Sequence, residues 1–131
     1  MRLLITGSRQ WTDKTELERV LWAQWSNSDG RLTIVHGDCP RGADRMVREF
    51  CERENEWAID STGGPLCVEE RHPANWDTHG KSAGFRRNAE MVSLGADLCI
   101  AFVVPGQSKG TQHTINLARK AGIPVEEVFS E

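Results

Sequence analysis

The sequence has no apolar run long enough to cross a lipid bilayer. A membrane-spanning helix needs roughly 20 predominantly apolar residues, whereas the most apolar stretch of this chain covers only residues 98–104. Near the N-terminus, Leu3-Leu4-Ile5 gives way to polar residues too soon to be the apolar core of a signal peptide. We therefore expect a cytoplasmic protein that has no membrane partner.

The chain also lacks the basic excess with which duplex-binding proteins neutralise phosphates. Its 131 residues include 16 basic and 19 acidic side chains, which gives a formal net charge of −3. This balance argues against nucleic acid as the partner, although it leaves room for a local basic patch. The 38% of hydrophobic and 27% of charged residues are typical of a folded globular chain.

Closely spaced metal ligands are missing as well. No Cys-x-x-Cys motif occurs among the four cysteines, which are Cys39, Cys51, Cys67 and Cys99. No cysteine and histidine pair has the short spacing of known zinc motifs either. We expect the cysteines to remain thiols in a reducing compartment, Cys51 and Cys99 to lie in the core, and the protein to need neither a metal nor a cofactor.

The chain does contain an alternation of short apolar runs with longer helical patterns, which is typical of stacked βαβ units. Strands are predicted at residues 3–5, 32–35, 98–104 and 125–129, with a further strand and a long loop between residues 56 and 80. One helix should begin after Asp13, and a second should end at about Asn55. A third should carry Phe85, Ala89 and Val92 on its apolar face, and a fourth should end before Gly122.

This pattern predicts a single Rossmann-like domain over residues 1–131. We expect a three-layer α/β/α sandwich around a mainly parallel sheet of about five strands, a typical sheet size.

Three predicted strands end in a glycine-rich turn that leads toward a helix, at residues 6–9, 36–44 and 105–111. In open parallel sheets, ligands bind at the carboxyl ends of the strands. Glycine allows the backbone to approach a phosphate, and the helix N-terminus favours the anion. One such loop is equally well explained by turn geometry, but three at one edge predict a ligand site. Its expected residues are Gly7, Ser8, Arg9, Gly37, Asp38, Gly42, Asp44, Arg87, Gly106, Lys109, Gly110 and Thr111.

Several of these side chains also have a purely structural explanation. Ser8 and Thr111 could contact phosphate oxygens or cap helices, and Lys109 could contact the ligand or only water. An arginine in the first turn of a helix opposes the helix dipole, which indicates a ligand role for Arg87 or its neighbour Arg86, and a solvent-facing arginine explains the position equally well. Tryptophans in the loops, Trp11 and Trp76, could stack on a base or pack the loops onto the domain.

The motifs resemble, in order, those of the SLOG superfamily of Rossmann-like nucleotide-binding proteins. The resemblance is carried by Gly7-Ser8-Arg9, Gly37 with Gly42-Ala43-Asp44, Arg87-Asn88-Ala89-Glu90-Met91, and Gly106 with Gly110-Thr111. Residues 73–84 resemble the YspA-like branch in particular. The resemblance implies binding of a nucleotide-type small molecule and a homo-oligomer, with a dimer as its expected form.

Members of this superfamily differ in what they do with the nucleotide. LOG enzymes hydrolyse the N-glycosidic bond of nucleoside monophosphates, other members sense ADP-ribose-type nucleotides, and DprA-like members bind single-stranded DNA. In the LOG signature, an Arg-Lys pair precedes Pro-Gly-Gly-x-Gly-Thr-x-x-Glu. Here Asn88 replaces the lysine, the glycine loop is one residue longer, and Thr114 replaces the catalytic glutamate.

These departures favour a protein that binds a nucleotide or a nucleotide-derived phosphate, such as a nucleoside phosphate or an ADP-ribose-like molecule, and acts as a sensor or sequestering module. The alternative is a nucleoside-monophosphate phosphoribohydrolase. Its catalytic candidates would be Arg87, Glu90 and Asp38, with Asp44 as a further carboxylate, because glycosidic cleavage needs a carboxylate. A DprA-like single-strand binder is a third reading, which the net charge disfavours.

Overall fold

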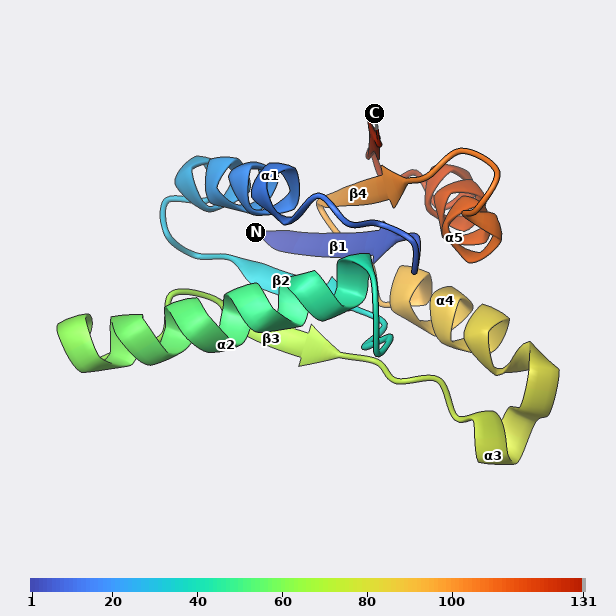
Figure 1. Cartoon of the computed structure of the whole chain (residues 1–131), viewed down its shortest axis with the longest axis horizontal. Coiled ribbons are helices and arrows are strands. Elements are labelled where there is room, and N and C mark those ends of the chain that lie inside the picture. Colours follow the sequence, from blue (N-terminus) through green and yellow to red (C-terminus); the bar gives the residue numbers. More distant parts are fainter. Residues whose placement is uncertain (131) are drawn as a thin grey trace.

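The computed structural model describes residues 1–130 and contains a five-stranded parallel sheet with the order β3-β2-β1-β4-β5 (Figure 1). The strands are β1 (Arg2–Gly7), β2 (Thr33–His36), β3 (Val68–Arg71), β4 (Leu98–Val103) and β5 (Val125–Phe129). All four pairings are parallel, so the carboxyl ends of the strands share one edge. The predicted fold class is confirmed.

Four helices flank the sheet, two on each face. They are α1 (Lys14–Asn27), α2 (Ala43–Thr62), α4 (Ala83–Ser93) and α5 (Lys109–Lys120). Alternate residues of β1 serve the two faces, because Leu3 and Ile5 pack with α1 and α2, whereas Leu4 packs with α4 and α5. This two-sided burial explains why the strand reads as a continuous apolar run.

The start of α1 follows the predicted capping pattern. The Asp13 carboxylate accepts a hydrogen bond from the Glu16 N–H at 3.0 Å. At the other end of the chain, α5 stops before Gly122, which has a φ of 81°. A left-handed glycine after the last turn is a common helix terminator.

The second helix is longer than predicted. Instead of ending near Asn55, α2 continues to Thr62 and stops at Gly63, which has a left-handed φ of 83°. Trp57 and Ile59 are apolar but exposed, which hides the helical period, yet Ala58 is buried and no glycine or proline interrupts the helix before Gly63. Figure 1 shows the last turns of α2 extending beyond the sheet.

The buried face of α4 is also different from the prediction. Phe85 and Ala89 are exposed, and only Val92 of the predicted apolar face is buried, together with Ala83, Asn88 and Met91. A buried asparagine cannot be recognised by an apolar pattern, which is why the face was misplaced. Before α4, the strand expected between residues 56 and 80 is β3, and the expected long loop after it includes a short helix α3 (Trp76–His79) and a 3₁₀ turn (Gly80–Ser82).

No helix within residues 1–130 combines the length and the hydropathy needed to span a membrane.

Candidate functional site

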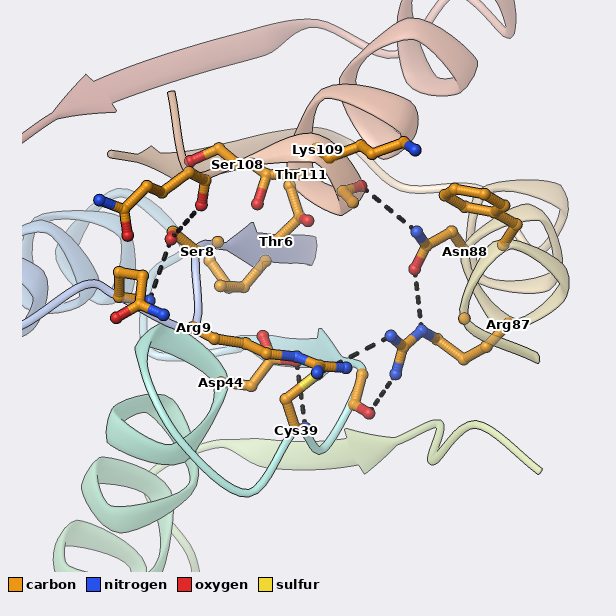
Figure 2. Close-up of a pocket in the computed structure, with 18 of the residues that line it drawn as sticks. Thr6, Ser8, Arg9, Cys39, Asp44, Arg87, Asn88, Ser108, Lys109 and Thr111 are labelled. Atoms are coloured by element: carbon orange, nitrogen blue, oxygen red, sulfur yellow. Dashed lines mark hydrogen bonds between the residues drawn. The ribbon is translucent and has the colours of Figure 1, made fainter. Parts of the chain in front are cut away.

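A pocket of about 430 Å³ lies at the carboxyl edge of the sheet, between the loops after β1, β2 and β4 and the start of α4 (Figure 2). Ten of the twelve expected site residues line it. They come from loops distant in sequence, which a parallel sheet brings to one edge. Sequence reasoning missed Thr6, Lys81, Phe85 and Asn88 among the lining residues.

Glycines allow the loops after β1 and β2 to touch. Gly42 has a φ of 75°, and a Cβ there would overlap the backbone of Arg9 and the carbonyl of Ser8. A Cβ on Gly7 would overlap the side chain of Ala43. Gly42 is one of the two expected residues that do not line the pocket, and its role is to let the loops pack closely.

Ser8 holds the loops together with its own polar groups. Its N–H donates to the carbonyl of Phe102 at 2.9 Å, and its hydroxyl donates to the carbonyl of Gln107 at 2.6 Å. The same hydroxyl accepts from the Gln10 N–H at 3.0 Å. Ser8 is therefore neither a helix cap nor a free phosphate donor, and its N–H group is unavailable to a ligand.

The first turn of α5 does offer free donors. The first hydrogen bond within this helix runs from the Gln112 N–H to the carbonyl of Ser108 at 2.8 Å, and the Ser108 hydroxyl bonds instead to the backbone of Val104. The N–H groups of residues 109–111 precede that bond and have no acceptor within residues 1–130. Such a helix start favours an anion.

Two threonines add hydroxyl groups to this part of the pocket. Thr6 at the end of β1 is 8% exposed, and Thr111 in the first turn of α5 is 3% exposed. Neither hydroxyl has a hydrogen-bond partner within residues 1–130, and both residues line the pocket. Figure 2 shows the two side chains facing the same space.

The pocket is cationic although the protein as a whole is not. Four basic side chains line it, from Arg9, Lys81, Arg87 and Lys109, against the single carboxylate of Asp44. Arg9 is exposed and has no side-chain partner in the described part of the chain. Figure 2 shows it reaching across the pocket. This local excess of positive charge favours an anionic ligand.

Arg87 is a special case among these cations because the protein already uses its guanidinium. Its Nε donates to Asn88 Oδ1 at 2.8 Å, and its terminal nitrogens contact the carbonyl of Gly37 and the Cys39 sulfur. The Asn88 amide in turn donates to the carbonyl of Gly110 at 3.3 Å. Arg87 thus connects the loop after β2 to α4 and, through Asn88, to α5.

Asp44 is a buried carboxylate in the first turn of α2. It is 5% exposed, and its Oδ2 accepts a hydrogen bond from the Cys39 N–H at 3.2 Å. Its Oδ1 is buried without any hydrogen-bond partner, and no basic side chain in the described residues pairs with it. Burial, and then the charge of Asp44, raise the pKa of the neighbouring Cys39 thiol.

The two other carboxylates considered for catalysis lie outside the pocket. Asp38 lies 3.3 Å from Arg48 in an ion pair, and Glu90 is exposed on α4. Neither lines the pocket. Within residues 1–130, no three His, Cys, Asp or Glu side chains come close enough together to hold a metal.

Comparison with known proteins identifies the family of the chain. A model of the YspA, cpYpsA-related SLOG family matches residues 1–79, which is more than half of the chain. The chain belongs to this SLOG family. It is also 44% identical over 124 residues to the Gene 61 protein of Mycobacterium phage D29, across 95% of this chain and 93% of that protein. No solved structure matches it.

The family match covers only part of the site of this SLOG protein. Residues 1–79 include the loops after β1 and β2, whereas Arg87 and the loop before α5 lie beyond them. The alignment with the phage protein spans nearly the whole chain. The predicted resemblance to the YspA-like branch is confirmed.

Two further predictions about this SLOG protein concern aromatic and polar side chains. Trp11 is 2% exposed and packs 5.2 Å from Phe102, so it supports the loop and does not contact a base. Trp76 is 50% exposed and lines the pocket. Thr114, which replaces the LOG glutamate, is fully buried and lies 3.4 Å from the carbonyl of Gly110.

Proposed function

We propose that the protein binds a nucleotide or nucleotide-derived phosphate in this pocket, as a sensor or sequestering protein. The observation that carries the proposal is the concentration of cations there. Four basic side chains and one carboxylate line the pocket of a chain whose net charge is −3. Membership of a SLOG family supports a nucleotide-related role.

The phosphate would bind at the first turn of α5. The free N–H groups of residues 109–111, the Thr111 hydroxyl and the Lys109 ammonium all belong to this turn. Arg9 would approach the same anion from the loop after β1. Hydrogen bonds between charged groups and phosphate are stronger than those between neutral groups.

The base would lie against the aromatic side chains of α3 and α4. Trp76 and Phe85 are 50% and 43% exposed and both line the pocket. Phe85 is supported from behind by His113, whose ring centroid lies 4.4 Å away. Exposed aromatic rings beside a phosphate site provide stacking surfaces for a base.

Calorimetric titration with AMP, GMP, CMP, UMP and ADP-ribose tests this proposal. We expect at least one of these ligands to bind, and Lys109→Ala to weaken its binding by about 1.5–3 kcal/mol, the usual value for a hydrogen bond to a charged group. Lys120→Ala is the matched control, because Lys120 is exposed at the other end of α5 and does not line the pocket. Equal losses in both variants, or no binding by any of the five, would contradict the proposal.

A phosphoribohydrolase is a second candidate function, favoured by one observation. The pocket does contain a carboxylate, Asp44, with an oxygen that has no hydrogen-bond partner within residues 1–130. The absence of a glutamate at position 114 argues against this activity. From the family resemblance we also propose a homodimer, which sedimentation velocity of the whole chain would test.

A further inference from the structure

We propose that Asp44 accepts a hydrogen bond from a sugar hydroxyl of the ligand, and that the pocket therefore prefers a ribonucleotide to its deoxy forms. This inference rests on the proposed function and names the ligand class more closely. Its basis is the one buried side-chain oxygen in the described residues that has no partner, Asp44 Oδ1.

The missing partner of Asp44 must be a hydrogen-bond donor. An ionised carboxylate only accepts hydrogen bonds, and the Cys39 N–H occupies one of the two oxygens at 3.2 Å. Almost all buried polar groups in native proteins are satisfied. Because Asp44 lines the pocket, a ligand is the obvious source of the second donor.

A neutral hydroxyl suits this position better than the other groups of a nucleotide. A phosphate beside Asp44 would be repelled by the carboxylate. The free N–H groups of residues 109–111, in the first turn of α5, are suited to bind the phosphate instead. Asp44 belongs to the first turn of α2 and residues 109–111 to the first turn of α5. Figure 2 shows Asp44 on the opposite side of the pocket from Lys109 and Thr111, so the sugar of a nucleotide can lie between the phosphate and Asp44.

The neighbouring charges are consistent with a donor that the ligand brings. Asp38 in the same loop is paired with Arg48, and Arg87 donates to Gly37, Asn88 and Cys39. Neither Arg48 nor Arg87 forms an ion pair with Asp44 in the described residues. Arg9 lines the same pocket, has no side-chain partner in the described residues, and forms no ion pair with Asp44 either.

The test compares ribonucleotides with their deoxy forms on the intact protein. Whichever of AMP, GMP, CMP, UMP and ADP-ribose binds most tightly is titrated beside its 2′-deoxy and 3′-deoxy analogues. We expect at least one analogue to bind about tenfold or more weakly, because a hydrogen bond to a charged group has that worth, and the analogue affected identifies the hydroxyl.

The Asp44→Asn variant then removes the free hydrogen-bond acceptor and keeps the shape of the site. The amide oxygen can still accept from the Cys39 N–H, but an NH₂ group takes the place of the free acceptor. The preference for the ribose form should fall to threefold or less, while binding of inorganic phosphate is not weakened. Asp38→Asn, a change in the same loop but outside the pocket, should keep the full preference.

Equal affinity of the unaltered protein for the ribo and both deoxy forms would overturn the inference, even if Asp44→Asn fails to fold. The inference would also be overturned if the affinity depended on an amino group of the base and not on the sugar hydroxyls. If none of the nucleotides binds, the proposed function itself fails, which is a different result from equal binding.

Discussion

The two arginines that line the pocket, Arg9 and Arg87, differ in their hydrogen bonds within the protein. Arg87 was predicted to be a counter-charge for the phosphate, and it also donates hydrogen bonds to Asn88 and to the backbone of Gly37. Arg9 has no side-chain partner within residues 1–130 and is exposed. Their substitutions should therefore have different effects.

We expect Arg9→Ala to weaken nucleotide binding by about 1–3 kcal/mol and to leave the melting temperature unchanged. Arg87→Ala should weaken binding by a similar amount and also lower the melting temperature, because it removes donors from partly buried acceptors. Calorimetric titration and thermal melting of the two variants give the comparison. An Arg87→Ala protein that binds normally would remove this side chain from the ligand site.

Two glycines of the site offer a second contrast at the residue scale. A Cβ on Gly110 would meet no atom within 4 Å, and its backbone is helical. A Cβ on Gly42 would overlap backbone atoms, at a φ of 75°. The glycine at 110 is therefore not needed for folding, whereas the glycine at 42 is.

We expect Gly110→Val to abolish nucleotide binding, since the side chain would stand where the phosphate approaches the α5 N–H groups. The unliganded protein should melt within a few degrees of the parent. Gly42→Ala should instead destabilise the fold by about 2 kcal/mol or more, from strain and from overlap. Thermal melting without ligand and titration with ligand distinguish the two. Normal binding by Gly110→Val would disprove the placement of the phosphate.

At the scale of elements, an ion pair joins β1 and β3, the two strands that flank β2. Arg2 of β1 donates two hydrogen bonds to Glu70 of β3, at 3.1 Å and 2.5 Å. These bonds, and then the contact with His72, lower the pKa of Glu70 from an ordinary 4.5 to about 2. The folded protein therefore binds this proton less tightly than the unfolded chain does.

It follows that the pair contributes fully to stability above pH 4.5 and loses its contribution as the pH falls toward 2. The two side chains are 28% and 34% exposed, which limits the contribution to about 1 kcal/mol or less. Denaturant unfolding of Glu70→Gln across this range should show a shallower loss of stability than the parent. Glu126→Gln, at an exposed site without an ion pair in the described residues, should behave like the parent.

The sequence predicted the elements whose patterns are local. β1, β2 and β4 were found because their apolar runs stop at turns, and α1 because Asp13 caps it, whereas β3, which has no apolar run, was only expected somewhere between residues 56 and 80. The length of α2 was missed because apolar residues of its last turns, Trp57 and Ile59, are exposed. The buried face of α4 was missed because it includes the polar Asn88. Both features depend on tertiary contacts, which cannot be predicted from the local spacing of apolar residues.

The same limit applies to the candidate site. Glycine loops at strand ends predicted where the pocket lies, and the sequence alone named ten of its lining residues. It could not show that Ser8 bonds to Phe102 and Gln107, or that one oxygen of Asp44 has no partner. The Ser8 bonds arise only where segments about one hundred residues apart meet, and the free oxygen of Asp44 depends on side-chain positions that the sequence pattern does not contain.

At the scale of the whole molecule, we predict no steady release of free base from nucleoside monophosphates. The LOG glutamate is replaced by Thr114, and Asp38 and Glu90 lie outside the pocket. Loss of a general base typically lowers turnover by 10²–10⁴-fold and leaves binding largely intact. Chromatography after incubation with AMP, GMP, CMP and UMP measures this. Multiple turnovers that Asp44→Asn abolishes would identify a hydrolase with a replacement carboxylate.

The bonds that Ser8 makes to β4 and to the loop before α5 have a kinetic consequence. Together with the bond from Ala43 N–H to its carbonyl at 3.1 Å, they hold all three glycine loops in place before a ligand arrives. A site that needs no ordering step should capture its anion at a rate set by diffusion and by the attraction of the cations, so this rate should fall with added salt. Differences in affinity among nucleotides should then arise mainly from how fast each one leaves.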